Sequence, residues 1–156
     1  MNRGYIAGTL GVLLALGALM AGCGGSDSPS ATTSEAPLTK AEFIRKGDAI
    51  CQVGNEASTT EIEEFAKENG FGSEPSKAQF EEAVTEVLVP NLERQTDELD
   101  ALAPPTQDED KIEALIASLR ETITKLEKNP GSLEENVLAE PIRLENAFGF
   151  KVCGGG

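Results

Sequence analysis

The chain has 156 residues, enough for one ordinary domain, and carries 13 Lys and Arg against 27 Asp and Glu, a formal charge of −14. Such an acidic surface repels phosphate backbones, so we expect no nucleic-acid partner. The chain has no His, the commonest general base and transition-metal ligand, and no nucleotide-binding or serine-nucleophile motif. We therefore expect no metal, no cofactor and no enzymatic activity.

Residues 1–22 are typical of a secretory signal peptide. Arg3 precedes an apolar run from Tyr5 to Met20, and two small residues follow it. Glycines interrupt the run, which is short for a spanning helix of roughly 20 apolar residues. An uncleaved N-terminal anchor helix is the alternative interpretation.

The segment Leu19-Met20-Ala21-Gly22-Cys23 resembles the lipobox of bacterial prolipoproteins, in which two small residues precede the cysteine. It departs from the usual pattern in having Met20 where an aliphatic residue is typical, with Leu19 displaced by one. The resemblance implies cleavage before Cys23 and a diacylglyceryl thioether on its sulfur. It also implies N-acylation, giving a palmitate-like anchor of two or three chains on the extracytoplasmic face of the cell membrane.

The segment after this cysteine predicts a flexible tether. Residues 23–37 contain no large apolar side chain, so they cannot bury enough surface to order themselves. Loss of Arg3 with the signal peptide leaves 12 basic against 27 acidic residues, a charge of −15. We therefore expect a helical domain over residues 38–156 that stands away from anionic headgroups.

The cysteine count agrees with lipidation. Three cysteines are present, and assigning Cys23 to lipid leaves Cys51 and Cys153 as a pair. In an oxidising envelope this pair predicts one disulfide that closes a loop of about 100 residues. A free thiol at either position is the competing interpretation, although neither cysteine has a neighbouring His or a CxxC partner.

Two long helices are expected first. Thr39 and Glu42 form a capping box, and apolar residues at helical spacing continue to Asn69-Gly70, with a pause expected at Ser58-Thr59-Thr60. A second capping box, Ser76 with Gln79, opens a helix that runs to Ala103-Pro104-Pro105. Pro90 lies inside it and predicts a kink or a break.

Two further helices follow. Asp108 begins a strongly amphipathic helix that Asn129-Pro130-Gly131 ends. A third capping box, Ser132 with Glu135, predicts a last helix that ends at Gly149, with Pro141 expected to divide it. Four amphipathic helices joined by short turns predict an all-α antiparallel bundle, stapled by the Cys51–Cys153 disulfide.

Acidic side chains supply the remaining site candidates. Asp48 lies between apolar turns of the first helix, where it either pairs with Arg45 at the surface or contacts a loop, ligand or partner. Clusters at 61–64, 108–110 and 134–135 suit solvated helix surfaces. A weak calcium site at Asp108-Glu109-Asp110 is the alternative for the second cluster. Gly47 and Gly54 share one helix face and predict a close helix contact.

Three segments, 43–51, 99–105 and 149–153, resemble a pattern in uncharacterised small lipoproteins of actinobacterial type. The resemblance implies a secreted helical domain and transfers no catalytic residue. Our first hypothesis is a non-catalytic module that contacts an envelope protein. The alternative is a carrier of a small apolar ligand, in a cavity opened near Pro90 and Pro141. A hydrolase that uses paired acids is third and needs two converging carboxylates.

Overall fold

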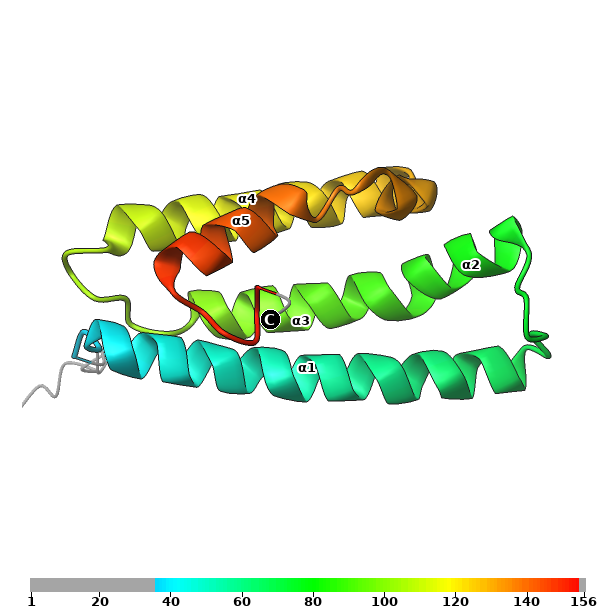
Figure 1. The fold of residues 1–156 in the computed structure, drawn as a ribbon, viewed down its shortest axis with the longest axis horizontal. Coiled ribbons are helices and arrows are strands. Elements are labelled where there is room, and N and C mark those ends of the chain that lie inside the picture. Colours follow the sequence, from blue (N-terminus) through cyan, green and yellow to red (C-terminus); the bar gives the residue numbers. More distant parts are fainter. Residues whose placement is uncertain (1–35, 155–156) are drawn as a thin grey trace, which may run out of the picture. The chain divides into compact units, whose positions relative to one another are not determined.

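We describe residues 36–154 of the protein from a computed structural model (Figure 1). The predicted signal peptide, Cys23 and nearly all of the predicted tether lie outside the described residues. The described part is all-helical and contains no strand, which confirms the predicted fold class. Its elements are α1 (Lys40–Glu68), α2 (Lys77–Ala83), η1 (Val84–Leu88), α3 (Val89–Asp100), α4 (Glu109–Lys128), η2 (Pro130–Glu135) and α5 (Ala139–Phe148).

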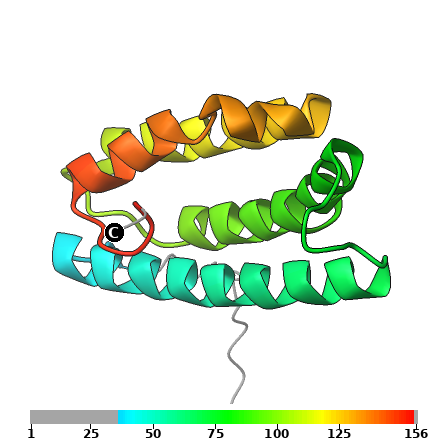
Figure 2. The ribbon, with the colours of Figure 1, turned by 45° about the vertical axis from the view of Figure 1, so that its right-hand side comes forward.

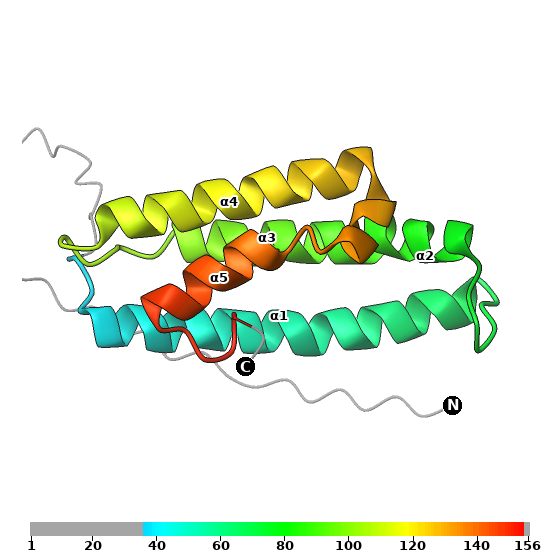
Figure 3. The ribbon, with the colours of Figure 1, turned by 45° about the horizontal axis from the view of Figure 1, so that its top comes forward.

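The helices form four antiparallel rods. α2, η1 and α3 run back along α1 as one rod, α4 reverses direction again, and η2 with α5 returns along α4 (Figures 1 and 3). α3 packs against both α1 and α4, so it is the central rod. The chain after α5 descends to α1, which Figure 2 shows clearly. The expected antiparallel bundle is therefore confirmed.

α1 is a single helix of 29 residues, and the pause expected at Ser58-Thr59-Thr60 is wrong. The hydroxyls of Thr59 and Thr60 donate to the carbonyls of Asn55 and Glu56, at 2.9 and 3.1 Å. These bonds satisfy the side chains inside the helix, so poor intrinsic propensity does not end it. The capping boxes at Thr39 and Ser76 are both formed as expected.

Pro90 widens its helix where we expected a kink or a break. Proline has no N–H, and its ring clashes with the carbonyl four residues earlier. The five residues Val84–Leu88 adopt π-helical hydrogen bonding, and the N–H of Val89 donates to the carbonyl of Val84, five residues back. This widened turn accommodates the missing N–H and the ring of Pro90, so the rod continues through α3 without interruption.

The last predicted helix begins later than expected. Ser132 does not cap a helix: its Oγ donates to the carbonyl of Asn129 at 2.7 Å, inside the 3-10 helix η2. Asn136 in the left-handed region (φ 63°) ends η2, and α5 begins at Ala139. Pro141 is the third residue of α5, where N–H groups have no helical partner, so it starts this helix and does not divide it.

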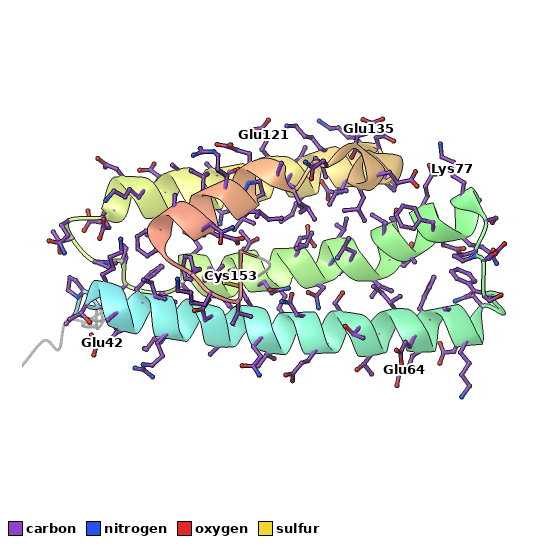
Figure 4. All side chains as sticks on the ribbon, in the orientation of Figure 1. Glu42, Glu64, Lys77, Glu121, Glu135 and Cys153 are labelled. Atoms are coloured by element: carbon purple, nitrogen blue, oxygen red, sulfur yellow. A yellow bond between two sulfur atoms is a disulfide. The ribbon has the colours of Figure 1, made fainter. Side chains whose placement is uncertain are left out.

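The core has two parts. The larger joins α1, α3, α4 and the chain after α5, around Phe43, Leu99, Leu115, Phe148 and Phe150. The smaller lies at the other end, where η1 and α3 meet α4 around Val84, Val89, Ile123 and Leu126. Charged side chains such as Glu64, Glu121 and Glu135 point away from the bundle in Figure 4.

Candidate functional site

A cavity of about 220 Å³ lies between the rods and is bounded by α1, α3, α4, α5 and the chain after α5. Most of its wall is apolar and comes from Leu88, Leu92, Leu99, Leu119, Leu138 and Ile142. Val152 and the Cys51–Cys153 disulfide close the end nearest α1. The polar side chains on the wall are Asn55, Gln95, Thr96 and Glu145.

Both proline features border this cavity. Leu88 belongs to the π-helical turn before Pro90, and Leu92 follows one helical turn later. Pro141 itself lines the opposite wall, in the first turn of α5. The cavity therefore lies where the two proline-adapted segments face each other.

Glu145 is the unusual side chain of this cavity. It lies on α5 and is only 5% exposed. Within residues 36–154 its carboxyl group makes no hydrogen bond or ion pair, whereas every fully enclosed side-chain nitrogen or oxygen in that range has a partner. Its oxygens therefore keep some accessible surface, and Glu145 is one of the residues that line the cavity. Burial, with a smaller contribution from the charge of Asp48, raises the pKa of Glu145 to about 8 from the usual 4.5.

Asp48 binds the backbone of the segment after α5, at residues 151–153. Its carboxylate accepts hydrogen bonds from the backbone N–H groups of Lys151, Val152 and Cys153, with shortest distances of 2.9, 2.8 and 3.4 Å. Pairing with Arg45, which the sequence favoured, is therefore wrong. The contact with a loop, which was the other interpretation, describes this residue. Three donated N–H groups satisfy the carboxylate, so its role in the structure is to position the cavity end.

The Cys51–Cys153 disulfide is present and confirms the predicted pairing. It ties the chain after α5 to the middle of α1, as the labelled Cys153 in Figure 4 shows. Phe150 fits beside Gly47, where an added Cβ would lie 2.4 Å from its ring. Gly47 therefore makes room for Phe150, and an added Cβ would also lie 3.0 Å from Leu99 of α3, so a close contact with another helix is present as well.

A polar link joins α1 to α3 beside the cavity. The amide of Asn91 is buried and donates to the backbone carbonyl of Gly54 at 3.0 Å. Gln95 donates to the side-chain oxygen of Asn91. An added Cβ on Gly54 would lie 2.1 Å from Gln95, so this glycine makes room for an amide side chain. The link fixes the wall formed by α3 relative to α1.

The acidic clusters noted in the sequence do not converge. Asp108 forms an ion pair with Lys111 and not a shared site with its neighbours, and a hydrogen bond from Lys111 lowers the pKa of that carboxyl. Within the described range no three Cys, Asp or Glu side chains are arranged to hold a metal ion. Asp48 and Glu145 interact electrostatically. The carboxylate of Asp48 is already bound by backbone N–H groups, and of these two side chains only Glu145 lines the cavity.

The structure thus brings together three of the four predicted site residues. Asp48, Cys51 and Cys153 meet at one end of the cavity, whereas Cys23 lies outside the described residues. Sequence reasoning missed Glu145. Its signal was periodicity: Glu145 lies four residues after Pro141 and three before Phe148, so it occupies the buried stripe of α5.

No protein-family model, curated protein or solved structure matches the chain. Across residues 36–154, no helix is both long and apolar enough to cross a bilayer.

Proposed function

We propose that the protein is a lipid-anchored, extracytoplasmic binding module whose helical domain holds a small, largely apolar ligand. The observation that carries this proposal is the apolar cavity with one buried carboxyl group that has no partner within residues 36–154. Ligand sites in proteins are typically apolar concavities with a few polar groups that orient the ligand. A cavity of 150 Å³ holds benzene, so by proportion this one suits roughly nine non-hydrogen atoms.

The described surface gives less support to a module that acts by protein contact. Its large exposed apolar side chains are Val53 and Ile62, both on α1. They are nine residues apart, and at 100° per residue they lie on opposite sides of the helix. They do not form one apolar patch of the kind that marks a protein-binding surface.

A substitution that fills the cavity tests the binding function. Leu92→Phe adds a ring to the cavity wall, whereas Leu133→Phe makes the same change at a half-buried core position that does not line the cavity. Benzene- to indole-sized fragments are screened by thermal shift. At ten times its dissociation constant a bound fragment adds about 1.4 kcal/mol, or roughly 5 °C, to wild type and to Leu133→Phe but not to Leu92→Phe. Equal shifts in both variants, or no shift in wild type, would contradict the proposal.

The anchor rests on the lipobox-like segment and on the pairing of Cys51 with Cys153, which leaves Cys23 as the single cysteine outside the disulfide. Expression of the whole chain in a lipoprotein-processing bacterium, followed by intact mass spectrometry of membrane extracts, tests it. We expect a chain that begins at Cys23 and carries two or three acyl groups. Cys23→Ala should abolish both acylation and membrane retention. A mature chain without acyl groups would overturn the anchor.

A further inference from the structure

No described residue on the cavity wall carries a positive charge. Among residues 36–154, Glu145 is the one ionisable side chain on that wall, because the disulfide removes both cysteines from titration. From α1, Asp48 acts on Glu145 through its charge. α3 and α4 face the cavity with neutral side chains, including Gln95, Thr96 and Leu119. The C-terminal segment presents Val152 there, while Lys151 is exposed and offers its backbone N–H to Asp48.

This charge distribution separates three kinds of ligand. An anionic ligand would meet the charge of Asp48 and the excess acidic charge of the whole chain, with no cation among the described wall residues to pair with it. A neutral ligand could use Glu145 as a single hydrogen-bond donor. A cationic ligand would instead let the carboxyl ionise and form a charge-assisted hydrogen bond away from water.

Resting on the proposed binding function, we propose that the ligand is a small protonated amine with an apolar body, whose ammonium group binds the carboxylate of Glu145. The apolar walls from η1, α3 and α5 enclose the body. Glu145 lies 5% exposed with no protein partner, so the ammonium supplies the hydrogen-bond donors that residues 36–154 do not. Phenethylamine, with nine non-hydrogen atoms, has the size that the cavity volume suggests.

Ionisation of Glu145 accompanies binding. In the free protein near neutral pH this carboxyl is mostly protonated, because burial and Asp48 raise its pKa to about 8. An ammonium group beside it favours the ionised form. Binding at pH 7 should therefore release close to one proton to the solvent, and affinity should rise roughly tenfold per pH unit below 8 and level off above it.

Isothermal titration calorimetry with three probes of similar size tests this inference. Phenethylamine, 2-phenylethanol and phenylacetate are titrated into the full chain without its lipid, at pH 6, 7 and 8, in two buffers that differ in ionisation enthalpy. We expect phenethylamine to bind wild type at pH 8 at least tenfold more tightly than 2-phenylethanol, and phenylacetate to give no measurable heat. The buffer dependence of the heat should report the released proton.

Two variants that each remove one carboxyl group from α5 test whether Glu145 causes the preference for the amine and the proton release. Glu145→Gln should lower phenethylamine affinity to that of 2-phenylethanol and abolish proton release, while leaving 2-phenylethanol binding unchanged. Glu140→Gln removes one charge from an exposed position of α5, where Glu140 pairs with Arg143 outside the cavity wall, and should change neither property. The pH and buffer dependence of wild type supplies the same test if Glu145→Gln fails to fold.

The outcomes separate the two proposals. If 2-phenylethanol binds and phenethylamine binds no more tightly and releases no proton, the amine inference is wrong and the binding function stands. If no probe binds wild type and the fragment screen also finds no ligand, both proposals are wrong.

Discussion

Removal of the Cys51–Cys153 disulfide is expected to lower the free energy of unfolding by about 4–5 kcal/mol. The bond joins residues 102 positions apart, and cross-linking a loop of that length removes much conformational entropy from the unfolded chain. A domain of this size is stable by only about 5–15 kcal/mol, so the loss is a large share of the total. The melting temperature should fall by roughly 15 °C or more.

Urea unfolding of wild type with and without reductant, beside the double variant Cys51→Ala/Cys153→Ala, measures this loss. Reductant should shift the midpoint of wild type and leave that of the double variant unchanged. The hydrogen bonds from the C-terminal segment to Asp48 and the seat of Phe150 beside Gly47 do not depend on the disulfide. Equal urea midpoints for the reduced and oxidised proteins would contradict the expected loss.

Glu145→Gln is expected to stabilise the protein in a pH-dependent way, by up to about 4 kcal/mol more at pH 8 than at pH 5. In the unfolded chain Glu145 ionises near pH 4.5, whereas in the folded protein its pKa is raised to about 8. Between these values the folded state holds a proton that the unfolded state has lost. The contribution of Glu145 to stability is therefore fully present below pH 4.5 and is lost at about 1.4 kcal/mol per pH unit until pH 8.

The experiment compares urea unfolding of wild type and Glu145→Gln at half-unit steps from pH 4.5 to 9. Other carboxyl groups act in the opposite direction: hydrogen bonds from Thr39 and Arg143 lower the pKa values of Glu42 and Glu140, so their contribution is present above their usual pKa and is lost in acid. Both proteins share these groups, so the difference between the two curves isolates Glu145. A difference that stayed constant across this range would show that Glu145 is not held protonated.

Local sequence was sufficient for most helix beginnings and ends. The capping boxes at Thr39 and Ser76 act within three residues, so their geometry follows from the residues themselves. Gly149 ends α5 with a φ of 115°, a conformation that glycine adopts without strain. These signals depend on backbone contacts of short range, which the sequence records directly.

The same local rules were wrong at Ser132 and at Pro141, where neighbouring segments decided the outcome. Ser132 has the capping-box spacing, but it lies in the 3-10 helix η2, which packs against α4 and α2. The start of α5 at Ala139 then places Pro141 where proline is tolerated. Local spacing could not show which helix turn Pro141 would occupy, because that depends on how η2 packs.

The sequence by itself determined the helical rods and the amphipathic faces and predicted the pairing of Cys51 with Cys153, because periodicity, caps and cysteine count are properties of the chain. Only the tertiary structure decided that Asp48 would hold the C-terminal segment and that Glu145 would face an apolar cavity. A carboxyl group on a helix has the same covalent chemistry whether it faces solvent, another chain segment or an apolar cavity. Its pKa and its partners depend on which other segments exclude water from it, and those segments come from residues up to 105 positions away.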